Sequence, residues 1–198
     1  MQSLAYPLQF HFKITTLSND FTVQDAHGQT VCYSKQKMLK LTEEVNIYND
    51  TTQSQRLYQI KADRWLDFSA AYTITDQNGL YKGKIARKGW ASIWKSRYEI
   101  YDQNEQQDLL VREENPWVKI ADALFSDIPI LGILSGYLFH PTYLVTRPDG
   151  TAVLRLQKEP SFWGRKFSLH QLSPFEKGEE ERTVLGLMMM LLLERRRG

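Results

Sequence analysis

The sequence predicts a mainly β protein, in which a closed antiparallel β-barrel is wrapped around an apolar C-terminal α-helix. The chain has 198 residues, of which 42% are hydrophobic and 24% charged, as in ordinary globular proteins. Hairpin patterns recur along most of it, and the run Val184–Leu193 is apolar on every side. A helix that is apolar all round has to be buried all round, which in a β-rich chain requires a sheet that encloses it.

Each hairpin pattern consists of an aromatic residue, an apolar–polar alternation, a polar turn and a second alternation. Aromatic and β-branched residues at a period of two favour half-buried strands. The turns combine aspartate or proline with glycine, which accepts a positive φ, and Glu105 stands at the glycine position of the third copy. Uneven spacing of the copies argues against a solenoid. The copies are Phe21–Val31, Tyr72–Tyr81, Tyr98–Glu105 and Tyr143–Val153.

Further strands are predicted between these hairpins, and many short strands joined by turns indicate a barrel or a sandwich. The need to enclose a helix favours the barrel. No linker or low-complexity stretch divides the chain, so we predict one domain, residues 1–198. The further strands are Lys37–Tyr48, Gln55–Ala62, Val153–Gln157 and Phe162–Leu172.

One segment, near residues 116–139, departs from the β pattern and is predicted to be a short helical, apolar insertion. Asn115 can cap a helix whose first residue is Pro116, and Trp117–Phe125 is amphipathic at helical spacing. Ile128–Phe139 follows, apolar but interrupted by proline and glycine. Two interpretations stay open for this stretch: a buried connector, or an insertion into a membrane surface.

The last apolar run is predicted to be helical because it is rich in leucine and methionine. Glu179–Glu181 precede it and Arg195–Arg197 follow it, an order that complements a helix dipole. As a helix the run spans roughly 15 Å, about half of a bilayer core, so we expect no transmembrane segment. Gly186 within it allows a close approach of the helix to the barrel wall.

The cysteine content and the first residues predict a cytoplasmic protein. Cys32 is the only cysteine, so no disulfide can form within the chain, as is usual in a reducing compartment. Residues 1–13 lack the basic start and long apolar stretch of a secretory signal.

No catalytic site is recognisable, and we predict that the protein is not an enzyme. A hydrolase needs a nucleophile, a base and an orienting acid, and the four histidines, His11, His27, His140 and His170, form no such motif. The chain contains no Gly-x-Ser-x-Gly elbow. Cys32 lies in a predicted strand, where a thiol is more often a small core residue than a nucleophile.

We likewise predict no metal and no cofactor. The sequence holds no cysteine pair, no His-x-x-x-His and no glycine-rich phosphate loop. Asp102, Asn104, Asp108 and Glu113 match four positions of a calcium-binding EF-hand loop. Gln107 replaces the loop glycine, however, and no flanking helices are predicted, so a solvated hairpin is the better interpretation.

Two basic groups are the candidate binding residues. Strand alternation puts Lys82 and Lys84 on one face, opposite Tyr81, Gly83 and Ile85. Tryptophans interleave with the first group, and Phe162 and Trp163 lie within the second. Aromatic rings among cations suit a lipid head-group interface or stacked bases. The first group is Lys82, Lys84, Arg87, Lys88, Trp90, Trp94, Lys95 and Arg97; the second is Arg155, Lys158, Arg165 and Lys166.

Three interpretations of these groups compete. They can form a solvated sheet face that is balanced by the acidic stretch Glu99–Glu114, they can bind anionic lipid, or they can bind nucleic acid. A net charge of +2 is too mild to argue for nucleic acid.

The hairpins with Asp-x-x-Gly turns, followed by an apolar C-terminal helix, resemble the tubby C-terminal-like superfamily. The resemblance covers roughly Phe21 to Leu193 and is greatest to its LURF-one-related branch, with distant similarity to phospholipid scramblases. The stretch Pro116-Trp-Val-Lys-Ile to Gly136-Tyr-Leu-Phe139 also resembles uncharacterised bacterial members. The resemblance implies a closed barrel threaded by its last helix.

Fold does not fix function, so the resemblance leaves the activity open. Its tubby branch implies a non-enzymatic module that docks to anionic phospholipid head groups, such as phosphoinositides, at a membrane surface. The alternative is a protein-interaction or structural module without lipid binding. A scramblase-like lipid mover needs a path through the membrane, and the sequence shows none.

Overall fold

The computed structural model describes residues 4–14, 18–37, 44–63, 71–88, 97–114, 142–160 and 165–194. These residues form strands followed by one helix, α3 (Glu179–Glu194). The strands are β1 (Leu8–Ile14), β2 (Ser18–Gln24), β3 (Thr30–Lys37), β4 (Glu44–Tyr48), β5 (Arg56–Ala62), β6 (Ala71–Asp76), β7 (Tyr81–Lys88), β8 (Arg97–Tyr101), β9 (Gln107–Glu113), β10 (Thr142–Thr146), β11 (Ala152–Glu159) and β12 (Arg165–Gln171).

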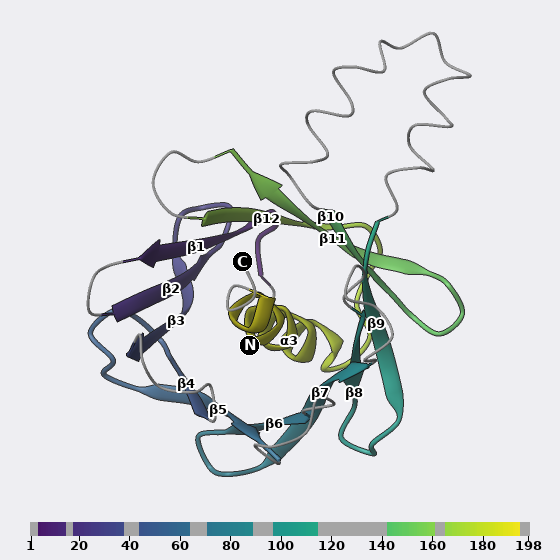
Figure 1. Ribbon diagram of the computed structural model, residues 1–198, viewed down its shortest axis with the longest axis horizontal. Coiled ribbons are helices and arrows are strands. Elements are labelled where there is room, and N and C mark those ends of the chain that lie inside the picture. Colours follow the sequence, from purple (N-terminus) through teal and green to yellow (C-terminus); the bar gives the residue numbers. More distant parts are fainter. Residues whose placement is uncertain are drawn as a thin grey trace, which may run out of the picture.

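The described strands form one closed antiparallel barrel, which confirms the predicted fold class (Figure 1). Each strand pairs with its neighbours in sequence, and β1 closes the barrel by pairing with β12 from Leu8↔Leu169 to Phe12↔Arg165. Closure leaves no long free sheet edge, which is the usual solution for an all-antiparallel sheet. The interior is therefore a single enclosed core.

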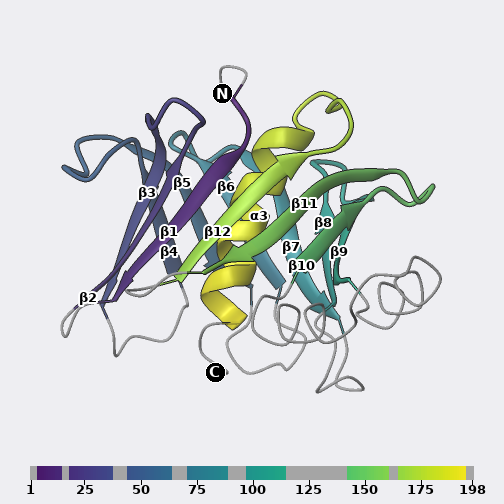
Figure 2. The ribbon, with the colours of Figure 1, turned by 90° about the horizontal axis from the view of Figure 1, so that it is seen from above.

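Helix α3 fills this core and crosses the barrel from one end to the other (Figures 1 and 2). Its residues from Arg182 to Leu192 are all buried, as its apolar surface requires. The helix approaches the wall closely at Gly186, where an added Cβ would lie 2.9 Å from Cδ1 of Ile100 and 3.6 Å from Cδ1 of Ile85. Glycine thus lets α3 pack closely against β7 and β8, and a larger residue would require Ile100 to shift.

Five hairpins share one irregularity, a β-bulge beside the turn at the end of the barrel where α3 begins. In each, the register skips one residue of the second strand, as between Ile74↔Gly83 and Thr75↔Tyr81. A bulge changes the face of the sheet to which the extra side chain points, and it increases the local twist of the strand. The extra residues are Val31, Leu57, Lys82, Asp108 and Val153.

The turns of three hairpins are held by an aspartate, as their sequences predict. Oδ1 of Asp25 accepts hydrogen bonds from the backbone N–H groups two and four residues on, at 2.9 and 2.8 Å, and Asp76 and Asp102 do the same. Glu105 adopts φ 61°, in the position where the other copies have glycine. In the β10–β11 hairpin, Arg147 occupies the position of the aspartate. Its side chain binds Glu179 in the first turn of α3 instead of capping the turn.

Most expected strands are found, with some differences. The predicted strand Gln55–Ala62 matches β5, and Val153–Gln157 lies within β11. The predicted strand Lys37–Tyr48 is not one strand, since β3 ends at Lys37 and β4 begins at Glu44. Strand β1 was not among the predicted strands, although Leu8, Phe10 and Phe12 alternate with polar residues. The insertion near residues 116–139 lies outside the described residues.

Candidate functional site

The two ends of the barrel differ in how their charged side chains are arranged. At the end where α3 begins, called here the helix-start end, charged side chains of the wall pair with oppositely charged side chains of the helix. At the opposite end, where the last turn of α3 lies (Figure 2), the wall cations Lys158 and Arg165 line a pocket together with Glu194 of the helix.

Arg147 holds the first turn of α3 in place. Its guanidinium donates to both carboxylate oxygens of Glu179, at 2.9 and 2.7 Å, and to the carbonyl oxygen of Pro174 at 2.8 Å. The second oxygen of Glu179 also accepts the backbone N–H of Glu176 at 2.8 Å, as in a capping box. Glu179 is only 1% exposed, so this carboxylate depends on Arg147 for its compensation.

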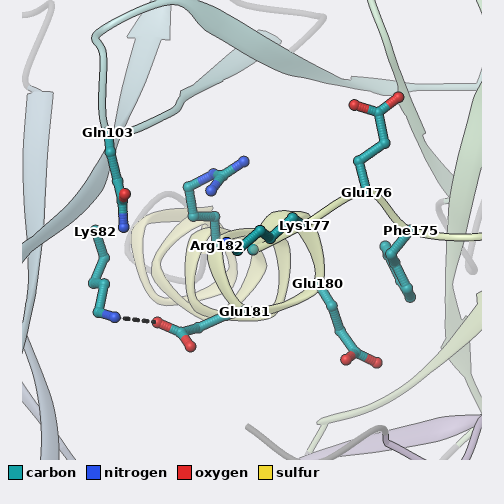
Figure 3. A pocket seen from close by; sticks show the side chains of 9 residues that line it. Lys82, Gln103, Phe175, Glu176, Lys177, Glu180, Glu181 and Arg182 are labelled. Atoms are coloured by element: carbon teal, nitrogen blue, oxygen red, sulfur yellow. Dashed lines mark ion pairs between the residues drawn. The ribbon is translucent and has the colours of Figure 1, made fainter.

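Two bulge residues complete the ion pairs of the helix-start end. Asp108 accepts hydrogen bonds from the guanidinium of Arg182, and Nζ of Lys82 lies 3.7 Å from carboxylate oxygens of both Asp76 and Glu181. A pocket of about 640 Å³ opens there (Figure 3). Its walls carry both signs of charge, which suits a closure of the barrel better than an anion site. The lining residues are Lys82, Gln103, Phe175, Glu176, Lys177, Gly178, Glu180, Glu181 and Arg182.

The prediction that Lys82 and Lys84 share a face is wrong. Lys82 is the extra residue of a bulge and turns toward Glu181 of the helix. Lys84 instead lies with Nζ 3.2 Å from Glu105 and 5.1 Å from the ring centre of Tyr101. A single bulge therefore separates two residues that strict alternation would keep together.

At the opposite end, three strands place a cation at the last inward-facing position. In β7, Arg87 follows the buried Ile85; in β11, Lys158 follows Leu156; in β12, Arg165 precedes Phe167. The register sets each cation opposite an aromatic residue, in the pairs Arg87↔Tyr98, Lys158↔Phe167 and Phe12↔Arg165. Barrel closure thus brings parts of both predicted basic groups to one opening.

Glu194, the last residue of α3, lies among these cations. It accepts a hydrogen bond from the hydroxyl of Tyr98. Burial and the nearby Glu194 carboxylate raise the pKa of Tyr98, and the charge of Arg87 acts in the opposite direction. Tyr143 lies close enough to act on the same hydroxyl. We call this set the helix-end mouth: Arg87, Tyr98, Tyr143, Lys158, Arg165 and Glu194.

A small pocket of about 140 Å³ opens within the helix-end mouth. Its floor is apolar, because Leu191, Phe12 and Phe167 are almost fully buried. Charged groups stand around this floor. The residues that line the pocket are Phe12, Tyr143, Lys158, Arg165, Phe167, Leu191 and Glu194.

The cations of the helix-end mouth differ from those of the helix-start end in their pairing. Within the described part of the chain, none of the ion pairs includes Arg87, Lys158 or Arg165. The buried Nε of Arg87 also has no hydrogen-bond partner there. Glu113 lies opposite Tyr143 in the register at the end of β9. The helix-end mouth as defined holds three cations and one carboxylate, Glu194. An anion that entered the helix-end mouth would therefore meet cations that form no ion pair within the described residues.

The remaining predicted site residues lie elsewhere. Arg155 pairs with Glu114 at 3.3 Å and Arg97 with Glu99 at 3.4 Å. Lys166 is exposed, next to His11 in the register, on the face of β12 opposite to Arg165. The side chain of Lys88 and all of Trp90, Trp94 and Lys95 lie outside the described residues. Among the described members of the two basic groups, Arg87, Lys158 and Arg165 are the ones at the last inward-facing positions of their strands.

The acids that match a calcium-binding loop in the sequence lie apart in the structure. Asp102 caps its turn and Asp108 binds Arg182, while Glu113 lies at the far end of β9, so these acids do not converge on one ion. No cluster of potential metal ligands occurs in the described ranges. The described helix is too short to cross a membrane.

Cys32 is expected to be chemically inert in the folded protein. It is fully buried, its Sγ lies 3.3 Å from Sδ of Met188, and burial raises the pKa of the thiol to about 12. Since the thiolate is the reactive species, Ellman's reagent should label native protein only as fast as the molecule opens. Labelling in urea should be fast, and Cys32→Ala should lower the free energy of unfolding by about 1 kcal/mol. Rapid labelling of the native protein would contradict this assignment.

Comparison of the chain with known proteins finds no matching family model, no matching curated protein and no matching solved structure. The resemblance to the tubby-like superfamily therefore rests on the hairpins and the last helix alone.

Proposed function

We propose that this protein is a non-enzymatic binding module that docks onto anionic phospholipid head groups at a cytoplasmic membrane surface. The observation that carries the proposal is the helix-end mouth. Lys158 and Arg165 line its pocket beside Glu194, and Arg87 acts on the Tyr98 hydroxyl that binds Glu194. None of these three cations forms an ion pair among the described residues. The cations Lys82, Arg147 and Arg182 at the helix-start end are all paired and serve as a contrast.

Docking through the helix-end mouth would be mainly electrostatic. Arginine and lysine donate charge-assisted hydrogen bonds to phosphate oxygens, and a low-dielectric floor strengthens such bonds. The floor of Phe12, Phe167 and Leu191 supplies that environment. Each cation near a negatively charged membrane contributes about 1 kcal/mol to binding. Salt should weaken the association, since it screens charges that lie at the surface.

Replacing Arg87, Lys158 and Arg165 together by glutamine should weaken binding to anionic vesicles by about a hundredfold. Three contributions of about 1 kcal/mol each correspond to a factor of this size. The measurement is co-sedimentation with vesicles, with and without anionic lipid, at low and high salt. The melting temperature of the variant should change little, because none of the three forms an ion pair that holds the described fold together.

Lys166→Gln provides the matched control for Arg165. It removes one positive charge at the adjacent residue, but from the outer face of the same strand. This control should bind vesicles almost as well as the unchanged protein. If the unchanged protein ignores anionic vesicles at low salt, the proposal fails and a protein-interaction or structural role takes its place. If Lys166→Gln weakens binding as much as Arg165→Gln, the outer face is the docking surface.

A further inference from the structure

The barrel wall has its shortest pairing between β3 and β4, which are neighbours in Figure 1. Within their described residues, the register of these two strands consists of one pair, Tyr33↔Tyr48. The other neighbouring strands pair over most of their common length. We call the unpaired stretches of the two strands, residues 34–37 of β3 and 44–47 of β4, the β3–β4 seam.

Both strands remain extended along the β3–β4 seam because their other neighbours hold them. β2 pairs with β3 as far as Lys37, and β5 pairs with β4 as far as Glu44. On the side of each strand that faces the seam, no register pair among the described residues takes up the backbone groups. Such an edge carries N–H and C=O groups that are spaced for another strand, and it is a template for strand addition.

Two polar side chains beside the seam have buried atoms without hydrogen-bond partners in the described structure, the hydroxyl of Ser34 and Oδ1 of Asn46. Ser34 is only 1% exposed. If the register of Tyr33↔Tyr48 continued, Lys35 would stand opposite Asn46 and could donate to its Oδ1. The absence of that bond among the described residues agrees with the end of pairing at Tyr33. It leaves polar groups that an added strand could satisfy.

The seam borders the packed core. On β4, Val45 is 1% exposed and Ile47 is fully buried. On β3, Ser34 faces the same way as Cys32, whose thiol contacts α3. Backbone groups this close to a core are seldom left without partners. We propose that the β3–β4 seam accepts an extended segment of a partner protein, which adds to the free edge of β3 as a further strand. This inference concerns residues other than those of the lipid site and does not depend on it.

The side chains along the seam specify the chemistry of this segment. Side chains of a strand alternate between faces, so one set would point inward beside Ser34, Val45 and Ile47. A hydroxyl residue flanked by aliphatic residues suits this side. The other set would point outward beside Lys35, which is exposed and takes part in none of the ion pairs among the described residues. Acidic residues suit that side, since opposite charges on neighbouring strands attract.

The probe for this surface is the peptide Glu-Val-Glu-Thr-Glu-Val-Glu, blocked at both ends and labelled with a fluorophore. Fluorescence anisotropy should show saturable binding to the full chain. Two matched peptides carry N-methyl groups, one on the glutamates and the other on the inward residues. In strand addition only one of these sets donates to the edge of β3. One N-methylated peptide should therefore bind at least about tenfold more weakly than the probe, while the other should bind almost as well.

A charge reversal tests the position of the peptide. Lys35→Glu should weaken binding of the probe by about fivefold, because acidic side chains of the peptide would then lie beside an acidic residue. Arg112→Glu is the matched control, since Arg112 is also exposed but lies on β9. This control should bind the probe like the unchanged protein. Equal weakening by both substitutions would show that the peptide responds only to net charge, and it would overturn the assignment to the seam.

Hydrogen exchange supplies a test that needs no peptide. In the free protein, backbone amides that point into the seam should exchange faster than those of β5, which is paired on both sides. Addition of the probe should slow the exchange of the seam amides. Slow exchange in the free protein at every concentration would assign the edge to another part of the chain. Protection that grows with protein concentration would assign it to a second copy, and either result overturns the inference.

Two further results would contradict strand addition. One is the absence of saturable binding of the probe, and the other is equal binding of the two N-methylated peptides. Neither bears on the proposed lipid docking, which is measured separately with vesicles and with substitutions in the helix-end mouth.

Discussion

Replacing Leu187 by aspartate is expected to abolish cooperative folding. Leu187 is fully buried in the middle of α3, inside the closed barrel. A charge placed there without a partner costs several kcal/mol, which is a large part of the 5–15 kcal/mol that usually separates folded from unfolded domains. The measurements are thermal melting by circular dichroism and size-exclusion chromatography, which should show a lost transition and aggregated protein.

Leu80→Asp is the control for this experiment. Leu80 is 59% exposed in the β6–β7 hairpin, so the same substitution there should leave the melting temperature nearly unchanged. A monomeric Leu187→Asp protein that melts cooperatively near the temperature of the unchanged protein would show that the helix is not the core of the barrel.

Arg147→Met is expected to lower the free energy of unfolding by about 3–5 kcal/mol, because it leaves a buried carboxylate without its partner. Glu179 is 1% exposed and Arg147 only 16%, so water can replace little of the lost interaction. Urea denaturation measures the change. Glu179→Gln introduced into the Arg147→Met variant should recover much of the loss, since it removes the uncompensated charge.

A second arginine serves as the comparison for Arg147. Arg155 also pairs with a glutamate, but its side chain is 39% exposed and that of Glu114 is 20% exposed. Ion pairs with this much access to water contribute about 0–1 kcal/mol, so Arg155→Met should be the milder variant. Equal losses for both variants would mean that the bond to Glu179 does not anchor the helix.

The fold could be predicted because its main signals are local or nearly so. An apolar run that is apolar all round identifies an enclosed helix, and Asp-x-x-Gly turns between alternating segments identify hairpins. Strand β1 was missed because it is a short alternating segment that no turn motif marks. It pairs with β2, which follows it, and with β12, which is distant in sequence.

The candidate site was predictable only in part, for two physical reasons. First, a bulge shifts the face of every residue beyond it, and nothing in the composition of β7 reveals that Lys82 is the extra residue. Second, the helix-end mouth is made by closure. Simple alternation from Leu156 and Phe167 already turns Lys158 and Arg165 inward, but only the closed barrel sets them around Glu194.

The order of the elements also has a consequence for biosynthesis. Every described strand precedes α3 in the chain, and the edge of β1 that does not pair with β2 must wait for β12. The barrel wall therefore leaves the ribosome before the element that fills it. Until α3 arrives, the inward side chains of the nascent wall face water or one another, a state prone to aggregation. Since the β1–β12 pairing and the packing of α3 join distant parts of the chain, we expect slow folding and dependence on chaperones during translation.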